Sequence, residues 1–338
     1  MVQEKLLTVN NLRTEFFSSK KSSVTAINEI SFHIDKGEIL GLVGESGCGK
    51  SVTSLSIMRL LNFTSGKVTK GEVIFEGQDL QQLPEKEMRT IRGGKMSMIF
   101  QEPMSSLNPA MRIDKQMIEG IRLHTDLTKE QARERAAKIL QQVGIPDPER
   151  VLKNYPHQLS GGMSQRVMIA MAMSCNPELL IADEPTTALD VTIQAQLLDL
   201  LKGLREKFGM SIILVTHDLG VVADFADRIQ VMYAGRVVER GTKEEIFRNP
   251  KHPYTWALLD SIPSRSLPRK SRLYSLKGTP PNLSLPIEGC PFAARCRYCM
   301  PVCRKCAPQP TDFSSTHQAS CWLNHPMAPQ HVREGGSK

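Results

Sequence analysis

A glycine-rich run that ends in lysine and serine, residues 44–51, has the clearest chemical meaning in this sequence. Its letters, GESGCGKS, have the G-x-x-x-x-G-K-S spacing of a loop that cradles phosphate groups. Residues 39–43 before it read as a short buried strand, and residues 52–61 after it are apolar at helical period. Glycines let backbone N–H groups turn toward phosphate oxygens, and the helix N-terminus adds the positive end of its dipole. The sequence therefore predicts a nucleotide site, with Lys50 on the β- and γ-phosphates and Ser51 on Mg²⁺.

An acidic pair, Asp183 and Glu184, comes at the end of the buried apolar strand predicted at residues 179–182. A phosphate-binding loop needs an acidic partner for the metal and a group that positions water. We expect Asp183 to hold Mg²⁺, directly or through water, and Glu184 to act as general base toward the attacking water. The alternative is that the pair only caps the next helix. The phosphate loop favours the catalytic interpretation.

A second candidate anion site lies between these elements, in residues 159–165, with the letters LSGGMSQ. Its Ser-Gly-Gly stands at the start of the helical run 166–175, where backbone N–H groups and a hydroxyl can bind an anion. One chain has only one γ-phosphate to hold. We therefore expect a head-to-tail pair of subunits with ATP between them. The alternative is a glycine-containing helix entry with no ligand.

These motifs, in this order, resemble those of the ATP-binding subunits of ABC transporters, over roughly residues 6–262. The resemblance implies an α/β fold of the P-loop NTPase type, an ABC ATPase core with an inserted helical subdomain. On this interpretation the ATP-binding domain is residues 1–262, with the helical subdomain at approximately 102–176. Residues 263–338 are a small cysteine-rich C-terminal extension.

The resemblance also implies roles for individual residues. The three segments above resemble Walker A, Walker B and the LSGGQ signature, with Met163 in place of the signature's glutamine. Gln101 matches the Q-loop, Asp190 the D-loop, and His217 the switch histidine. Phe16 matches the aromatic residue that stacks on adenine, although Phe17 beside it is an alternative. The implied catalytic residues are Lys50, Gln101, Glu184 and His217; the Mg²⁺ ligands are Ser51, Gln101 and Asp183; and the residues in contact with ATP, with 160–162 acting across the subunit pair, are Phe16, Gly44, Glu45, Ser46, Gly47, Cys48, Gly49, Lys50, Ser51, Val52, Ser160, Gly161, Gly162 and Asp190.

Six of the eight cysteines lie close together after residue 289. In a sequence that does not open with a secretory signal, such clustering favours metal ligation over disulfides. Residues 296–299 and 303–306 form C-x-x-C pairs, which are typical of zinc sites. Only three residues separate these pairs, whereas a zinc ribbon leaves about 15–20. Zinc, an iron–sulfur cluster and unligated thiols all remain open on spacing alone.

Within the ABC family, the chain most resembles the ATPase subunits of bacterial dipeptide and oligopeptide importers. The phrases IFQEPMSSLNP at residues 99–109 and HPYT at residues 252–255 carry this resemblance, together with the cysteine tail. It implies a [4Fe–4S] cluster, with Zn²⁺ as the alternative metal. The ligands implied are Cys290, Cys296, Cys303 and Cys321, with Cys299 and Cys306 as non-ligands.

Composition sets limits on function. The 338 residues are 40% hydrophobic and 23% charged, as in ordinary soluble proteins, and no apolar run approaches the roughly 18 residues of a membrane-spanning helix. The net charge of +8 lies mostly in residues 260–338, but only 5% of residues are aromatic, which argues against a base-stacking surface for nucleic acid.

The functional hypothesis is an ATP-hydrolysing motor subunit of a bacterial ABC importer for di- or oligopeptides. We expect it on the cytoplasmic face of the cell membrane, bound to a second, related ATPase subunit and two membrane permease subunits, and served indirectly by an extracytoplasmic solute-binding protein. The alternatives are an importer ATPase for another solute, such as nickel or a glycoside, or a soluble ABC ATPase that acts in DNA repair or on ribosomes. A further alternative makes the cysteine tail a redox or metal sensor.

Overall fold

The computed structural model describes residues 4–19, 22–102, 106–186, 191–262 and 276–329. The chain divides into two compact units. Unit 1 comprises Met1–Leu6, Ile34–Glu38 and Phe75–Val215, and unit 2 comprises Leu7–His33, Ile39–Ile74 and Thr216–Lys338.

Unit 1 contains three neighbouring parallel strands. Strand β7 (Leu179–Asp183) lies between β6 (Met96–Ile99) and β8 (Ser211–Thr216) and is parallel to both. Every residue of the three strands is buried. Continuous apolar runs such as LLIA are typical of parallel strands covered on both faces, and the strand predicted at residues 179–182 is confirmed.

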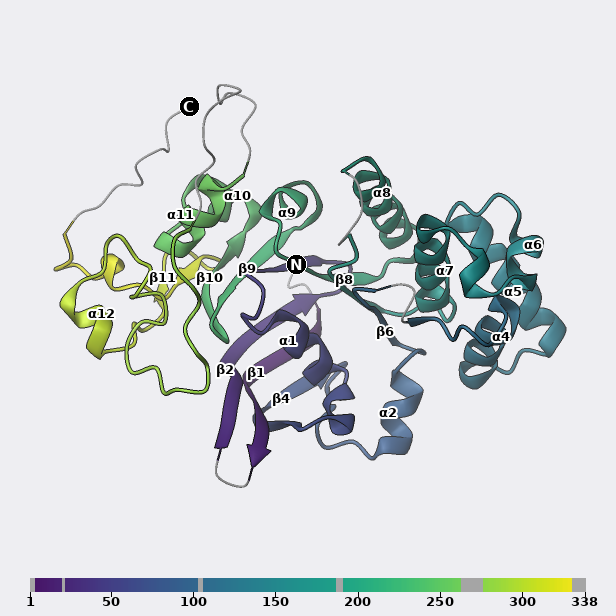
Figure 1. Ribbon diagram of the computed structural model, residues 1–338, viewed down its shortest axis with the longest axis horizontal. Helices are drawn as coiled ribbons and strands as arrows, with labels where there is room; N and C mark the ends of the chain where they lie inside the picture. The colour runs from purple at the N-terminus through teal and green to yellow at the C-terminus, as the bar shows by residue number, and fades with distance from the viewer. Residues whose placement is uncertain (1–3, 20–21, 103–105, 187–190, 263–275, 330–338) are drawn as a thin grey trace. The chain divides into compact units, whose positions relative to one another are not determined.

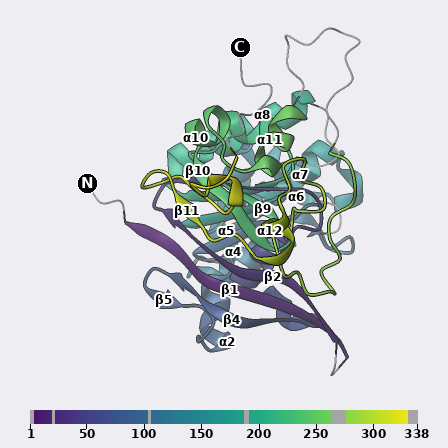
Figure 2. The same ribbon diagram turned by 90° about the vertical axis from the view of Figure 1, so that its left-hand side faces the viewer.

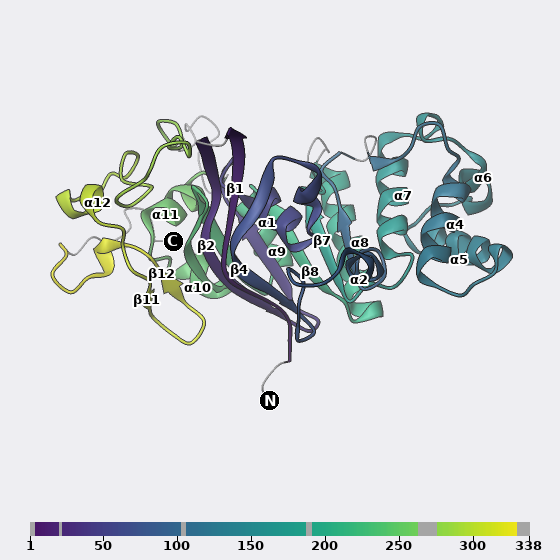
Figure 3. The same ribbon diagram turned by 90° about the horizontal axis from the view of Figure 1, so that it is seen from below.

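A group of packed helices forms the other part of unit 1 (Figures 1 and 3). Helix α5 (Lys129–Gln142) contacts α4 (Ile113–His124), α6 (Pro148–Lys153) and α7 (Gly161–Met173). A capping box begins this helix: the Thr128 hydroxyl accepts a hydrogen bond from the backbone N–H of Gln131, and the side chain of Gln131 accepts one from the backbone N–H of Thr128. The remaining elements of unit 1 are β5 (Gln78–Asp79), α2 (Glu85–Ile91), the 3₁₀ turn Pro156–Gln158 and α8 (Val191–Phe208).

Unit 2 contains a sheet that continues into the C-terminal segment, residues 276–329 (Figure 2). Strand β3 (Ile39–Val43) is parallel to β9 (Arg228–Tyr233), which pairs antiparallel with β10 (Arg236–Thr242). Beyond β10 come two short strands, β12 (Gln318–Ala319) and then β11 (Thr311–Asp312), both labelled in Figure 3. The C-terminal segment therefore extends the sheet of the same unit. The predicted domain boundary after residue 262 falls at a stretch outside the described residues and stays a prediction.

Unit 2 also contains longer strands, some before the phosphate loop in the chain and one after it. Strand β1 (Lys5–Ser19) lies between β2 (Ser22–Asp35) and β4 (Gly66–Phe75). The helices and 3₁₀ turns of unit 2 are α1 (Lys50–Ile57), Leu60–Phe63, α9 (Leu219–Phe225), α10 (Lys243–Arg248), α11 (Pro253–Asp260), α12 (Pro301–Lys305) and Trp322–Asn324.

Helix α1 differs from its predicted range of 52–61. It begins at Lys50 and ends at Ile57, and a separate 3₁₀ turn follows. The break has a local cause, because Arg59 adopts a left-handed conformation (φ 52°) that an α-helix cannot accommodate.

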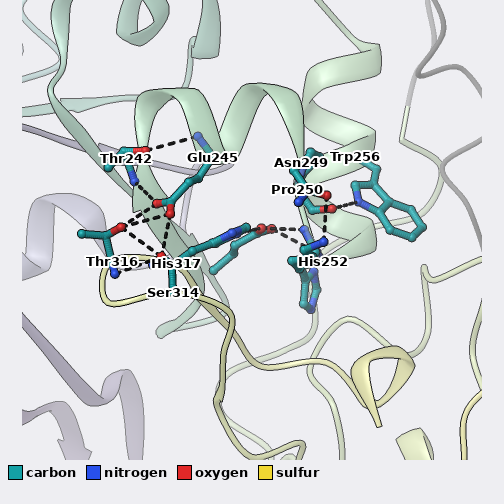
Figure 4. Close-up of polar contacts among 11 residues, drawn as sticks. Thr242, Glu245, Asn249, Pro250, His252, Trp256, Ser314, Thr316 and His317 are labelled. Carbon is teal, nitrogen blue, oxygen red and sulfur yellow. Dashed lines mark hydrogen bonds and ion pairs between the residues drawn. The ribbon is translucent and has the colours of Figure 1, made fainter. Parts of the chain in front are cut away.

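Two carboxylates, the buried Glu239 and the half-buried Glu245, fasten the C-terminal segment to β10 and α10 (Figure 4). Glu239 accepts hydrogen bonds from the backbone N–H groups of Lys251 at 2.6 Å and His252 at 3.0 Å, and its carboxylate lies 2.8 Å from Nε2 of His317. Glu245 accepts from the hydroxyls of Ser314 and Thr316. Polar groups buried in this way need partners, so residues 314–317 complete the polar contacts of the preceding strand and helix.

None of the helices in the described part of the chain has the length and apolar character that crossing a lipid bilayer requires.

Candidate nucleotide-binding site

The phosphate loop predicted at residues 44–51 joins β3 to α1, as the sequence indicated. Gly44 (φ 157°) and Gly49 (φ 106°) have backbone conformations that favour glycine, and space restricts both. A Cβ atom at Gly44 would lie 2.2 Å from the carbonyl oxygen of Met232, and one at Gly49 would lie 2.7 Å from that of Ala26. The loop therefore packs closely against the backbone at Met232 and at Ala26, and only glycine fits at these two positions.

Lys50 is buried within this loop. Its ammonium group donates hydrogen bonds to the carbonyl oxygens of Gly44 at 2.7 Å and Glu45 at 3.1 Å. The positive charge therefore lies inside the turn of the loop, beside the first residues of α1, including Ser51. A cation and a helix N-terminus at one place suit the oxygens of a phosphate chain.

The neighbouring Cys48 is also buried, and burial raises the pKa of its thiol. A neutral buried thiol is a small apolar group. The contact with ATP predicted for this position therefore concerns its backbone.

The acidic residues predicted for catalysis lie in unit 1, at the end of β7. Asp183 is the last residue of the strand and is buried. Glu184 follows in a left-handed conformation (φ 46°), and its N–H donates to the carbonyl oxygen of Val215 at 2.9 Å. A residue other than glycine held at positive φ costs free energy, and such strain is typical of functional sites.

Gln101 contacts Glu184 directly. Its Nε2 lies 3.1 Å from a carboxylate oxygen of that residue. The structure thus brings two residues that the sequence assigned to the same reaction into one place, within unit 1.

The glycine-rich signature begins α7. Ser160 is the N-cap residue, and its hydroxyl accepts from the N–H of Met163 at 3.4 Å. Ser160 and Gly161 are exposed. A Cβ atom at either Gly161 or Gly162 would meet open space, so local crowding does not require glycine here. A ligand or a partner that approaches the backbone closely would require it.

Comparisons with known proteins identify the family. Residues 27–187 match the ABC transporter family, and residues 238–303 match the C-terminal region of oligopeptide/dipeptide transporters. The oligopeptide transport ATP-binding protein OppD of Bacillus subtilis is 52% identical to the chain, over 96% of this chain and 91% of that protein. The chain is an ABC transporter ATP-binding protein.

Further relatives agree with this assignment. The dipeptide transport ATP-binding protein DppD of Bacillus subtilis is 51% identical, over 99% of both chains. Among solved structures, the chain is similar to the dimeric post-hydrolysis state of an ATP-binding cassette bound to ADP and Pi, with a TM-score of 0.63 and 30% sequence identity. The alignment covers 70% of this ABC ATPase and 98% of the chain in that structure. The predicted α/β P-loop fold of an ABC ATPase is confirmed.

Three other predicted ATP-site residues of this ABC ATPase are less well defined. His217 is exposed and follows β8, and it stays a prediction. The Phe16 ring lies against β4, where a Cβ atom on Gly66 would be 2.8 Å from it, while Phe17 is 39% exposed. The choice between the two rings stays open. Asp190 lies outside the described residues.

The C-terminal segment of the ABC ATPase contains a small cavity. Its lining includes Cys290, Cys296, Cys303 and Cys321, the four residues predicted as cluster ligands, and not Cys299 or Cys306. Burial raises the pKa of the thiols of Cys290, to about 11, and of Cys296 and Cys321, each to about 12. All six cysteines of this segment are free.

The side chains around this cavity are not arranged as a finished metal site. Across the described residues, no group of three or more His, Cys, Asp or Glu side chains is positioned to hold a metal ion. The four cysteines predicted as ligands therefore line one cavity, but their side chains are not placed as a coordination shell around a metal.

Two contacts around the nucleotide motifs had no signal in the sequence. Gln165, the last letter of the signature segment, is buried and donates from its side chain to the carbonyl oxygen of Pro185, one residue after Glu184. Arg295, far along the chain, pairs with the loop residue Glu45. Both contacts depend on tertiary structure, so spacing along the chain could not indicate them.

Proposed function

We propose that this ABC ATPase is the motor subunit of a bacterial importer for di- or oligopeptides. As a member of its family it binds and hydrolyses ATP. One observation supports the peptide assignment above others. The chain combines an ABC cassette with a segment that matches the C-terminal region of oligopeptide/dipeptide transporters, and relatives about half identical over nearly their whole length are named for oligopeptide and dipeptide transport.

The residues of the phosphate loop bind the nucleotide in this proposal. Lys50 leaves the carbonyl oxygens of Gly44 and Glu45 and contacts the β- and γ-phosphates, while backbone N–H groups of the loop hold the remaining oxygens. Ser51, Gln101 and Asp183 are the Mg²⁺ ligands. The metal ion, when bound, neutralises charge that develops on the phosphates.

Hydrolysis then depends on Glu184, which accepts a proton from the attacking water. The hydrogen bond from Gln101 holds its carboxylate in one orientation. His217 contacts the γ-phosphate, and residues 160–162 contact it from a second subunit in a head-to-tail pair. The exposed Ser160 and Gly161 and the dimeric structural relative support this arrangement.

Coupling to transport takes place at the membrane. We assign to the protein a related second ATPase subunit and two permease subunits, with an extracytoplasmic solute-binding protein acting indirectly. Closure of the ATPase pair on two ATP molecules moves the permeases, and hydrolysis reopens it. The protein is then a peripheral subunit on the cytoplasmic face of the membrane.

Uptake measurements test this function. Cells that lack the protein should lose uptake of labelled di- and oligopeptides and keep uptake of nickel and glycosides. Normal peptide uptake together with lost nickel or glycoside uptake would replace the peptide assignment with the other solute. Purification of the tagged chain from membranes should yield permease subunits and a second ATPase subunit.

We also propose a [4Fe–4S] cluster on Cys290, Cys296, Cys303 and Cys321. Four cysteine thiolates are the usual ligand set of such a cluster, and these four line one cavity. The zinc alternative on two C-x-x-C pairs requires Cys299 and Cys306, which do not line it.

Metal analysis of anaerobically purified protein tests the cluster. Iron and acid-labile sulfide should be present in the wild type and be lost in Cys290→Ser and Cys321→Ser. The variants Cys299→Ser and Cys306→Ser are the matched controls and should retain both. Stoichiometric zinc without iron, or loss of metal in the control variants, would refute the proposed ligand set.

A further inference from the structure

Arg295 of the C-terminal segment forms a two-pronged ion pair with Glu45, the second residue of the phosphate loop. One terminal nitrogen lies 3.0 Å from Oε1 of Glu45, and the other contacts Oε2. The arginine side chain is only 5% exposed, and that of Glu45 is 29% exposed. A bidentate pair with so little solvent is among the stronger polar contacts in proteins, and its planar geometry fixes both side chains.

Other groups hold the guanidinium of Arg295 in place. It donates to the backbone carbonyl oxygens of Leu276, at 3.4 Å, and Lys277, at 3.1 Å. It also donates to the hydroxyl of Tyr233 at 3.3 Å and lies 5.8 Å from the centre of that ring. Because its position is set by these contacts, Arg295 acts as a fixed anchor for Glu45.

The backbone of Glu45 is held as well. Its N–H donates to the hydroxyl of Tyr254 at 2.8 Å, and its carbonyl oxygen accepts from Lys50 at 3.1 Å. The Tyr254 ring packs against Phe292, with ring centres 5.4 Å apart. Two residues of the C-terminal segment, Arg295 and Phe292, thus support Glu45 in the phosphate loop.

Electrostatics gives this contact a second effect. Glu45 places a carboxylate within the loop that receives a triphosphate, and like charges at such distances repel. Arg295 compensates that charge. Without Arg295 the carboxylate would be unpaired and only partly solvated, and it would disfavour the bound nucleotide.

We infer that Arg295 is a positioning residue for ATP binding. Through its pair with Glu45 it holds the phosphate loop in the shape that receives the β- and γ-phosphates. It also offsets the negative charge of Glu45. The inference rests on the proposed role of this loop in ATP binding. It assigns to the C-terminal segment a part in nucleotide affinity, exerted through Glu45. Arg295 immediately precedes Cys296, which lines the cysteine cavity.

The test compares ATP kinetics of the purified ATPase complex carrying single variants. Arg295→Gln should raise KM for ATP about tenfold, as expected for a residue that acts through a neighbour, with kcat changed by less than about twofold because binding and not the chemical step is affected. Arg295→Lys keeps the charge but not the bidentate geometry and should fall between. Arg304→Gln is the matched control, an exposed arginine that also adjoins a cavity cysteine, and should leave KM unchanged.

A double-mutant cycle separates the inference from a general loss of structure. Glu45→Gln breaks the same pair without altering the C-terminal segment, and should also raise KM for ATP. The double variant Glu45→Gln/Arg295→Gln should lie closer to wild type than the product of the two single effects, because it leaves no unpaired charge. Independent, multiplicative effects, or an unchanged KM in both single variants, would overturn the inference.

Wild-type protein measured alongside separates a failure of the proposed function from a failure of the role of Arg295. If the wild type shows no affinity for Mg-ATP, the proposed function fails. If the wild type binds and Arg295→Gln binds equally well, only the role of Arg295 is lost.

Discussion

Gln101 and Glu184, 83 positions apart in the sequence, meet at a distance of 3.1 Å between amide nitrogen and carboxylate oxygen. One follows β6 and the other follows β7, and these strands are parallel neighbours. The carboxyl ends of adjacent parallel strands lie at one edge of a sheet, which is where ligands bind in α/β proteins. The contact therefore links a proposed metal ligand to the proposed base.

Replacing Glu184 by glutamine should abolish turnover and leave ATP binding intact. The amide is of equal size but cannot accept the proton of the attacking water, so hydrolysis should fall at least about 100-fold, which is the lower limit typical of a lost general base. The variant should accumulate closed subunit pairs. ATPase assays, nucleotide-binding titrations and size-exclusion chromatography in the presence of Mg-ATP measure these effects.

The matched control is Glu178→Gln, at the opposite end of the same strand. Glu178 has a long ion pair, 3.9 Å, with Lys95, and should tolerate the change with near-normal turnover. Wild-type rates in Glu184→Gln would rule out the assignment of Glu184 as base.

The cavity thiols should react slowly and with a steep dependence on pH. Burial raises the pKa of Cys290 to about 11 and of Cys321 to about 12, so both are neutral thiols near pH 8 in metal-free protein. Only the thiolate is nucleophilic, and its fraction rises about tenfold for each pH unit below the pKa. Alkylation by iodoacetamide should therefore accelerate about tenfold per unit from pH 8 toward pH 10.

Cys306 provides the internal comparison because it is exposed. Mass spectrometry of digests should find it alkylated well before Cys290 and Cys321 at pH 8. Equal rates for the exposed and the buried cysteines would contradict the described burial.

Replacing Glu245 by alanine should destabilise unit 2. The carboxylate caps the start of α10 and accepts hydrogen bonds from Ser314 and Thr316. We expect a loss of about 1–3 kcal/mol in the free energy of unfolding at pH 7, the range for a lost cap with unsatisfied neighbours. Denaturant unfolding followed by tryptophan fluorescence measures it, since Trp256 lies in this unit.

The pH dependence of that loss has a definite sign. Partial burial raises the pKa of Glu245, but hydrogen bonds from Ser314, Thr242 and Thr316 outweigh it and leave the pKa below its usual 4.5. A lowered carboxyl pKa contributes stability that is present above pH 4.5 and is lost as the pH falls through the folded-state value. The gap between wild type and Glu245→Ala should thus narrow below about pH 4. Glu244→Ala, an exposed neighbour, should show little change at any pH.

Sequence reasoning succeeded where the physical cause is local. The buried strand before Glu184 follows from the short apolar run at residues 179–182. The phosphate loop is recognisable because its glycines are required by close backbone contact. Each of these signals is contained within about a dozen neighbouring residues.

Contacts between distant segments were not predictable in this way. Arg295 and Glu45 are separated by 250 positions, and His317 and Glu239 by 78. A single arginine or histidine in a polar, proline-rich stretch has no periodicity to indicate its partner. Strand β12, only two residues long, gave no strand signal either, because its pairing with β10 depends on the fold around it.

The position of β12 beside β10 has a practical consequence for attempts to prepare a minimal cassette. A chain shortened before residue 311 would turn β10 into an open edge with unsatisfied backbone groups, and edges of that kind recruit strands from other molecules. It would also remove His317 from the carboxylate of Glu239. Such truncated protein should aggregate or require detergent to stay in solution.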